Sequence, residues 1–171
     1  MDALAHATIG STYNQYAGSK LRRDRLRRYL AERADARILL VGEAAGYRGA
    51  RVSGIPFTSE RQLTGRGPAE ASATIVHRVL GELGIERDVL LWNLVPTHPH
   101  RPGDGLSNRP PTRAEIVAGR PFLDALAFRA NPKLVLAVGR LAQRELDAPY
   151  VRHPSHGGAR GFRENLLAWL T

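Results

Sequence analysis

Short, wholly apolar runs alternate along this chain with segments of helical periodicity. The runs at 36–41, 88–95 and 133–138 are typical of strands buried on both faces of a parallel sheet, and a shorter run at 150–152 predicts a fourth strand. Apolar positions at helical spacing predict helices at 19–34, 68–83, 112–129, 140–146 and 162–170. Because strands alternate with helices, we expect an α/β fold: a single three-layer α/β/α domain with a central, mainly parallel four-stranded sheet.

The residues between these segments support the same order of elements. Thr112 and Glu115 have the spacing of a capping box, which predicts the start of a helix. The stretch 96–111 contains five prolines, so we expect a long irregular loop, and such loops are often functional. No internal repeat or linker divides the chain, and we therefore treat residues 1–171 as one domain.

The composition narrows the class of protein. With 43% hydrophobic and 24% charged residues, the 171-residue chain is typical of a globular domain. Its apolar runs are far shorter than the roughly 18 residues of a membrane span, and residues 1–9 lack the pattern of a secretory signal. We expect a cytoplasmic monomer with no membrane partner. The absence of cysteine excludes disulfides, thiolate nucleophiles and cysteine-ligated metal clusters.

The chain is strongly basic, and the charge comes almost wholly from arginine. Twenty-five basic residues oppose sixteen acidic ones, for a net charge of +9, and only Lys20 and Lys133 are lysines. Arginine suits bidentate contacts to phosphate, so the surplus favours an anionic partner such as nucleic acid, although a G+C-rich genome produces the same bias. The arginines at 22–28 leave a similar choice open, between a phosphate contact and a solvated helix face.

Chemically distinctive residues follow three of the predicted strands. Gly42–Gly46 comes after the first strand, Asn93 lies at the end of the second, and His153–Gly158 follows the fourth. In open α/β sheets a ligand binds beyond the carboxyl ends of the strands. We therefore expect these three segments, which are far apart in sequence, to form one site.

Each segment has a plain and a functional interpretation. Gly42–Gly46 lacks the spacing of dinucleotide and P-loop motifs, and is either a tight turn or a stretch of approachable backbone N–H groups. The Asn93 amide either bonds a neighbouring loop or presents a donor and an acceptor to the imide edge of uracil, a pattern that disfavours cytosine. His153 is either a loop histidine bonded to backbone or a donor to a developing oxyanion.

Two other chemistries are disfavoured at these positions. Ser155 does not lie in a G-x-S-x-G elbow, so it is not expected to be a hydrolase nucleophile. The histidines of the two loops match no zinc-binding spacing, so we expect no metal at His98, His100, His153 and His156.

Four motifs, taken in order, resemble those of the uracil-DNA glycosylase superfamily. They are VGEAAG after the first strand, GIPF at Gly54–Phe57, WNLVP around Asn93 and VRHPS around His153. Each motif alone is weak, but all four occur in the family's order and at suitable separations. The sub-pattern is closest to the thermophile-type, family 4-like branch, whose second strand also leads into a proline-rich loop ending in N-R-x-P, here residues 108–111.

The chain departs from the family pattern at several positions. The family 4-like branch usually binds a 4Fe–4S cluster through four cysteines, and this chain has no cysteine. Tyr47–Arg51 replaces the acidic residues that follow the first motif in that branch. Ala44 stands where related enzymes carry a water-activating aspartate, which leaves Glu43 as the only carboxylate of the motif. Gly46 stands where they place a bulky tyrosine against the thymine methyl, so another group must reject thymine.

The resemblance implies a DNA repair glycosylase that flips uracil out of DNA and hydrolyses its N-glycosidic bond, leaving an abasic site, without a cofactor or metal. Phe57 would stack on the extruded base and Asn93 would read its imide edge. His153 would stabilise the uracil anion, and Glu43 is the second catalytic candidate. The uracil-binding set is therefore Gly42, Glu43, Ala44, Phe57, Asn93 and His153.

The segment after the last motif corresponds to the family segment that enters DNA from the minor groove. Contacts with uracil-containing DNA are therefore expected from Arg152, Ser155, His156, Gly157 and Arg160, with Arg160 a candidate for insertion into the base stack. During repair the protein would associate with a bacterial nucleoid. Two alternatives remain: a relative that removes other deaminated bases or retains the abasic product, and a nucleic-acid-binding α/β protein without excision chemistry.

Overall fold

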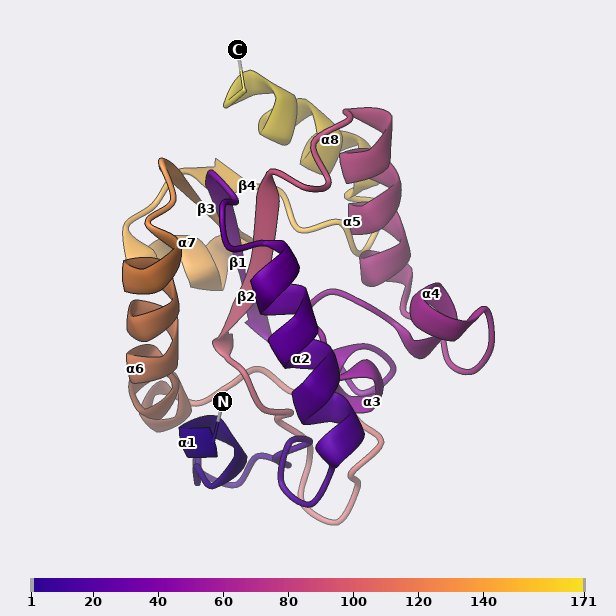
Figure 1. Ribbon diagram of the computed structural model, residues 1–171, viewed down its shortest axis with the longest axis vertical. Coiled ribbons are helices and arrows are strands. Elements are labelled where there is room, and N and C mark those ends of the chain that lie inside the picture. Colours follow the sequence, from indigo (N-terminus) through magenta and orange to yellow (C-terminus); the bar gives the residue numbers. More distant parts are fainter. Residues whose placement is uncertain (1, 171) are drawn as a thin grey trace.

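Four parallel strands form the central sheet of the computed structural model, which describes residues 2–170 (Figure 1). They lie in the order β2-β1-β3-β4 and comprise β1 (Ile38–Ala44), β2 (Val89–Val95), β3 (Leu134–Val138) and β4 (Tyr150–Val151). Each neighbouring pair is parallel, and Gly42 of β1 lies beside Asn93 of β2. The predicted α/β class is confirmed, with a sheet that is wholly rather than mainly parallel.

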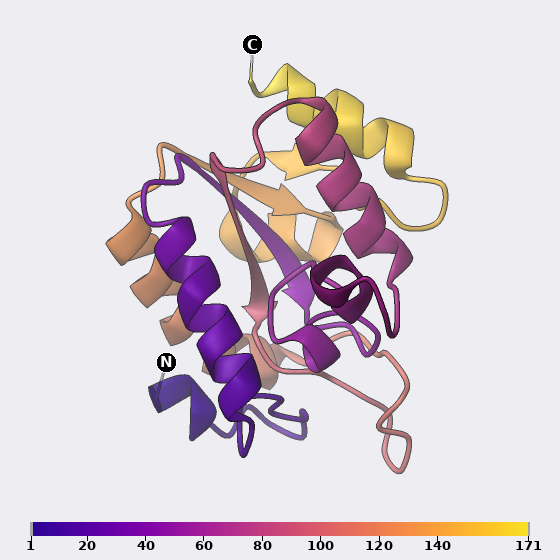
Figure 2. The same cartoon turned by 45° about the vertical axis from the view of Figure 1, so that its right-hand side comes forward.

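Helices cover both faces of this sheet. The longer ones are α2 (Lys20–Glu32), α5 (Ala71–Glu82), α6 (Arg113–Ala130), α7 (Arg140–Leu146) and α8 (Ala159–Ala168). Figure 1 and Figure 2 show α6 and α7 on one side of the sheet and α5 and α8 on the other. The short helices were not predicted; they are α1 (Asp2–Ala5), α3 (Ala50–Ser53) and α4 (Glu60–Thr64). None of the helices in residues 2–170 combines the length and apolar character needed to cross a membrane.

Helix α2 packs beside the outer edge of β2, which is the first strand of the sheet order. The backbone N–H of Leu91 points away from the sheet and donates to the Tyr29 hydroxyl at 2.7 Å. Leu26, on the same helix, is fully buried in the core. The periodicity of 19–34 therefore reflects a helix that both fills the core and covers a strand edge.

The structure moves several of the predicted boundaries. β1 was expected to end at residue 41, but its pairing with β2 continues through Gly42 and Ala44, so residues 42–44 lie in the strand and not in a loop. α5 begins at Ala71 rather than at Pro68, whose carbonyl instead accepts a hydrogen bond from the Arg61 N–H at 3.2 Å. β4 ends at Val151. The capping box at the start of α6 is confirmed, since the Thr112 hydroxyl accepts from the Glu115 N–H and the Glu115 carboxylate accepts from the Thr112 N–H.

Candidate active site

A cleft of about 370 Å³ opens at the carboxyl ends of the strands. Residues of β1 and β2, the loop after β4, the proline-rich loop and the segment 44–72 line it. The structure thus brings together seven residues that the sequence assigned to the site: Glu43, Ala44, Phe57, Asn93, His153, Ser155 and His156. Four glycines of the surrounding backbone mark three corners at which side chains converge: Gly42, Gly139, and Gly46 together with Gly49.

At the first corner, an aromatic ring and an amide meet over a glycine. A methyl group at Gly42 would overlap the tip of the Phe57 ring and lie 2.9 Å from Asn93 Oδ1, so only glycine fits there. Asn93 is 3% exposed, yet among the described residues its amide has no hydrogen-bond partner. The interpretation that this amide bonds a neighbouring loop therefore finds no support, and the amide is free for a ligand. We call Gly42, Phe57 and Asn93 the amide corner.

The backbone of Phe57 is held in the left-handed region, with a φ of 51°. This conformation is strained for a bulky side chain and persists only where its surroundings impose it. Ser53 provides part of that constraint, because its buried hydroxyl donates to the carbonyl of Thr58 at 2.6 Å. The strained residues outside helix ends, Phe57 and His156, are both residues that the sequence assigned to the site.

Glu43 and His153 meet at the second corner, beside Gly139 at the start of α7. Glu43 Oε1 lies 3.5 Å and His153 Cβ lies 3.6 Å from the Cβ position of Gly139. Burial raises the pKa of the Glu43 carboxyl above its ordinary value of 4.5. A desolvated carboxylate beside an imidazole is suited to accept a proton. We call Glu43, Gly139 and His153 the histidine corner.

The loop after β4 fixes the tautomer of His153. The backbone N–H of Ser155 donates to His153 Nδ1 at 3.2 Å, and the Ser155 hydroxyl lies 2.7 Å from the same nitrogen. Because a backbone N–H can only donate, Nδ1 is the acceptor, and the neutral ring carries its hydrogen on Nε2. Burial, reinforced by the charges of Arg152 and His156, lowers the pKa of His153 below 6.5 and favours the neutral ring. His153 therefore has a single N–H donor, at Nε2.

The third corner contains a carboxylate that the sequence did not reveal. Glu70 immediately precedes α5 and lines the cleft. A methyl group at Gly46 or at Gly49 would overlap its carboxylate, so Glu70 occupies the space that side chains at those two positions would need. Burial raises its pKa above 4.5. An acidic residue before a helix is common and carries no distinguishing pattern, which is why the sequence did not single it out. We call Gly46, Gly49 and Glu70 the Glu70 corner.

The proline-rich loop, residues 96–111, is fixed against the end of β1 by polar contacts. His98 is fully buried, and its Nδ1 donates to the Ala45 carbonyl at 2.7 Å. The Tyr47 N–H donates to Asn108 Oδ1 at 3.0 Å. The loop predicted from its prolines is therefore ordered and forms part of the cleft wall.

An ion pair anchors the same loop to α6. The Arg109 guanidinium donates to both carboxylate oxygens of Glu115, at 2.6 and 2.8 Å, and Glu115 is 2% exposed. Arg109 and the Thr112 N–H hold the pKa of Glu115 down at about 2. Glu115 thus serves the capping box and the loop anchor at once, and the N-R-P-P motif has a structural role in this chain.

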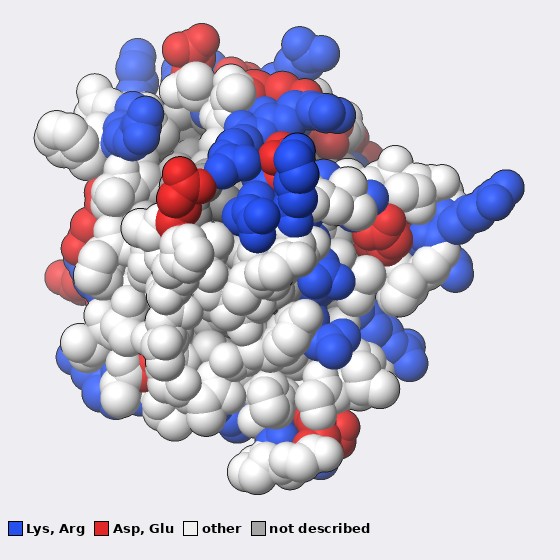
Figure 3. Space-filling model, turned by 60° about the horizontal axis from the view of Figure 1, so that its bottom comes forward, with Lys and Arg blue, Asp and Glu red and all other residues white. Residues whose placement is uncertain are grey.

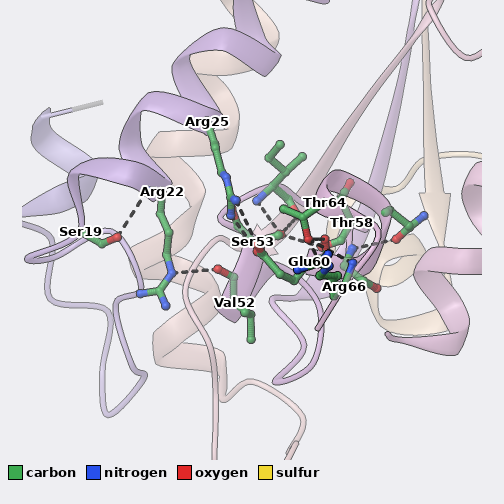
Figure 4. Close-up of polar contacts among 12 residues, drawn as sticks. Ser19, Arg22, Arg25, Val52, Ser53, Thr58, Glu60, Thr64 and Arg66 are labelled. Carbon is green, nitrogen blue, oxygen red and sulfur yellow. Dashed lines mark hydrogen bonds and ion pairs between the residues drawn. The ribbon is translucent and has the colours of Figure 1, made fainter. Parts of the chain in front are cut away.

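Arginines of α2 tether the segment that carries Phe57 (Figure 4). Arg22 Nε donates to the Val52 carbonyl at 2.9 Å, and Arg25 forms a two-pronged ion pair with Glu60 at 2.7 and 2.9 Å. The two interpretations of the arginines at 22–28 were a phosphate contact and a solvated face. For Arg22 and Arg25 the structure shows a third role, which is to hold α3 and α4 against α2.

The predicted DNA-contacting residues lie between the end of β4 and the start of α8. Ser155 and His156 line it, while Arg152 packs its side chain against Gly161 and donates its backbone N–H to Asn165. Arg160 is exposed on α8 and pairs with Glu164 at 2.7 Å. Figure 3 shows basic side chains gathered over one part of the face that it presents, above a largely uncharged area. No contact with DNA is thereby tested, and the assignments remain predictions.

No metal site is formed by the described part of the chain. Within residues 2–170, no group of three or more His, Cys, Asp or Glu side chains is arranged to hold a metal ion. His98 stacks on His100 with ring centroids 5.9 Å apart, while His153 and His156 belong to a different loop. The thiolates by which the family 4-like branch binds its iron–sulfur cluster have no counterpart in a sequence without cysteine.

Comparisons with known proteins agree with this geometry. The model of the uracil DNA glycosylase superfamily matches residues 30–168. The crystal structure of wild-type SMUG2 from Pedobacter heparinus superposes with a TM-score of 0.73, covering 99% of this chain and 94% of that one at 11% sequence identity. At that identity the likeness shows the fold alone. No curated protein matches the sequence.

Proposed function

The chain belongs to the uracil DNA glycosylase superfamily, and on that premise we propose that it is a monofunctional DNA glycosylase that removes uracil. The observation that carries this proposal is the convergence of three groups on one cleft. These are the partner-free amide of Asn93, the ring of Phe57 and the single N–H donor of His153. Together they match the edge, the face and the 2-carbonyl of one pyrimidine base.

Recognition begins when the target nucleotide is flipped out of the base stack. Phe57 stacks on the extruded ring, and its constrained backbone keeps the side chain in place without a substrate. The Asn93 amide accepts from the ring N3–H and donates to O4, a pairing that uracil offers and cytosine does not. Gly42 leaves room for the Phe57 ring beside Asn93, and Ala44 lines the cleft at the end of β1.

The chemical step breaks the bond between C1′ of the sugar and N1 of the base. The electron pair leaves with uracil and is spread onto O2, where the Nε2–H of His153 donates to the developing negative charge. A water molecule attacks C1′ of the oxocarbenium-like sugar, and Glu43 takes its proton. The uracil anion takes up a proton from solvent and Glu43 returns its proton to solvent, so the products are free uracil and an abasic site.

The neutral state of His153 suits this step. Its lowered pKa keeps the ring uncharged before reaction, so the new charge on O2 is stabilised by a donor already in position. The raised pKa of Glu43 makes that carboxylate a better proton acceptor than an exposed one. Both shifts come from the burial of the histidine corner.

The DNA strand lies across the rim of the cleft in this proposal. His156 and Ser155 face the backbone of the substrate, and Arg152, Gly157 and Arg160 contribute contacts around them, with Arg160 the candidate for insertion into the stack. The net charge of +9 favours such a polyanionic partner. We propose that the chain acts as a single-domain monomer in the cytoplasm.

The test is single-turnover excision on oligonucleotides that carry one uracil, hypoxanthine or xanthine, single-stranded and opposite each base. We expect abasic sites from uracil, detected by strand cleavage in alkali. The Asn93→Ala, His153→Ala double variant serves as the control for contaminating activity from the expression host. A folded wild-type protein that releases no uracil contradicts the proposal, and release of purines alone would point to the relative that acts on other deaminated bases.

A further inference from the structure

We propose that Glu70 is the specificity-determining residue that closes the base pocket at C5, so that the site accepts pyrimidines with hydrogen at C5 and rejects 5-methylated ones. This inference rests on the proposed function and adds to it the residue that separates uracil from thymine. Gly46, which stands where related enzymes place a tyrosine, contributes no side chain for this purpose, and neither does Gly49. The wall comes from a different segment of the chain.

The orientation of the base follows from the three corners. Asn93 at the amide corner takes the N3–H and O4 edge, and His153 at the histidine corner takes O2. In a pyrimidine ring C5 lies opposite C2, so a base held at those two corners turns its C5–H toward the remaining one. The group that closes the remaining corner is the Glu70 side chain, which lies against Gly46 and Gly49.

The carboxylate of Glu70 takes up the space where a side chain at either glycine would otherwise stand. A methyl group on Gly46 or on Gly49 would overlap it, which shows that no room is left between Glu70 and these two residues. A 5-methyl group on a bound base must enter the same corner. It would then meet a desolvated carboxylate rather than an open or apolar space.

The backbone of Glu70 is held by hydrogen bonds on both sides, which fixes the position from which its side chain extends. The Glu70 N–H donates to the buried hydroxyl of Ser59 at 2.8 Å. The Glu70 carbonyl accepts from the Thr74 N–H at 3.0 Å and from the Thr74 hydroxyl at 3.1 Å, at the start of α5. The main chain is fixed, while within residues 2–170 the carboxylate itself has neither a hydrogen-bond partner nor an ion-pair partner.

A carboxylate without partners in a cleft has a second possible role, as the acceptor of the proton from the attacking water. The two roles make different demands on the side chain. A steric wall depends on the volume of the Glu70 side chain and not on its charge, so glutamine can replace glutamate in this role. A proton acceptor needs the carboxylate, so glutamine cannot replace it.

The experiment compares Glu70→Ala and Glu70→Gln with the wild type on single-stranded oligonucleotides carrying uracil, 5-fluorouracil, thymine or 5-bromouracil. One extra methyl group in a fitted pocket changes specificity by about 10–200-fold. We expect Glu70→Ala to lower the preference for uracil over thymine by at least about tenfold, while uracil excision stays within a few-fold. Glu70→Gln should keep most of the preference and most of the uracil rate.

A binding measurement separates this inference from the proposed function. Oligonucleotides with a 2′-fluoroarabino sugar resist cleavage, so their affinities with uracil or thymine report on the pocket alone. The wild type should bind the uracil form more tightly, and Glu70→Ala should remove most of that difference. Glu82→Ala, on the far end of α5 with a half-exposed side chain, is the matched control and should change neither ratio.

Each result decides the role of Glu70. If Glu70→Ala keeps the wild-type preference for uracil over thymine in both cleavage rate and affinity, Glu70 does not exclude the 5-methyl group. A Glu70→Gln protein that binds uracil normally but excises it at least 100-fold more slowly assigns Glu70 to proton transfer instead. If the wild type binds uracil in preference to thymine but excises no base, the steric role of Glu70 is retained and the proposed glycosylase function is contradicted.

Discussion

Two carboxylates beside the same cleft are held in opposite ways. Glu115, at the start of α6, receives hydrogen bonds from both prongs of Arg109 and from the Thr112 N–H, and its pKa falls to about 2. Glu70, at the start of α5, receives none from residues 2–170, and burial raises its pKa above 4.5. Glu115 lies in the first turn of α6 and Glu70 immediately precedes α5, and only Glu115 is marked in the sequence, by its capping-box spacing.

The difference separates side chains that stabilise the wall of the cleft from side chains that remain available to a ligand in it. Glu115 has its hydrogen-bonding capacity taken up by the protein, and it anchors the proline-rich loop. Two histidines also differ at Nδ1, since Nδ1 of His98 donates to the Ala45 carbonyl, whereas Nδ1 of His153 accepts and leaves Nε2–H for a ligand. Nε2 of His98 is buried without a partner among the described residues, and His98 does not line the cleft. A buried polar group without a protein partner is costly, and a ligand can complete one that lines a cleft.

The largest effect is expected where the loop anchor is broken. Arg109→Ala leaves Glu115 buried without its ion-pair partner, and removing one member of a buried pair costs about 3–5 kcal/mol of unfolding free energy. Chemical denaturation measures this loss. Arg120→Ala, which removes a half-exposed partner of Asp124, is the control and should change stability by less than about 0.5 kcal/mol. Equal losses of unfolding free energy in the two variants would show that the Arg109–Glu115 ion pair stabilises the protein no more than an exposed ion pair does.

The next effect concerns chemistry rather than stability. His153→Ala removes the donor to the leaving base, which typically costs about 10²–10³ in rate, or roughly 2.7–4 kcal/mol. We expect that loss in single-turnover excision, with affinity for uracil-containing DNA within a few-fold. His156→Ala should do the reverse and weaken binding more than chemistry.

His98→Ala is the matched control for His153. It removes a buried side chain that bonds the end of β1, so we expect a lower melting temperature and a smaller loss of rate. A His153→Ala protein that excises uracil at the wild-type rate would exclude the leaving-group role. A fall in stability and binding together would show that His153 only shapes its loop.

A smaller loss is expected at the amide corner. Asn93→Ala leaves the imide edge of the bound base without a partner, which costs about 1–3 kcal/mol, or roughly 5–150-fold in uracil excision. Asn93→Asp should also weaken uracil excision and shift the preference toward cytosine, because the donor pattern changes. The control is Asn165→Ala, because Asn165 lies on α8 and its side chain accepts a hydrogen bond from the backbone N–H of Arg152. Unchanged activity in both folded Asn93 variants would contradict this assignment.

The finest test is the pH dependence of stability, where the two carboxylates should behave oppositely. The folded-state pKa of Glu115 is lowered, so its contribution is present above pH 4.5 and is lost as the pH falls toward 2. The folded-state pKa of Glu70 is raised, so its contribution is present below pH 4.5 and is lost as the pH rises through the raised value.

Two glutamine variants expose this difference. Relative to the wild type, Glu70→Gln should be more stable at pH 7, with a gain that shrinks below pH 4.5. Glu115→Gln should be less stable at pH 7, with a loss that shrinks toward pH 2. Melting temperatures at several pH values measure both. Parallel profiles would mean that the two carboxylates have the same environment.

The fold and half of the site were predictable because they follow from the sheet. The apolar runs identify the strands, and the rule that ligands bind at the carboxyl ends of strands brings Glu43, Asn93 and His153 together. The end of β1 was placed three residues too early, because the glycine at 42 suggested a turn. Its pairing with β2 shows that this glycine is needed for close approach.

The other half of the site depends on contacts that leave no pattern in the sequence. Helices α3 and α4 are short and are held by Arg22 and Arg25 of α2, which read as surface arginines. Glu70 takes its place through the Ser59 hydroxyl, eleven positions earlier in the chain. Such tethers join a single side chain to one backbone group or to one other side chain, so neither periodicity nor motif spacing can reveal them.

The Tyr29 hydroxyl bears on how this protein behaves at high concentration. An outermost strand offers its unpaired amides to any other extended chain, and growth of one sheet onto another begins there. By accepting from the Leu91 N–H, Tyr29 occupies one of these positions on β2, and the bulk of α2 stands over its neighbours. The helix that completes the core therefore also makes this edge of the sheet a poor template for aggregation.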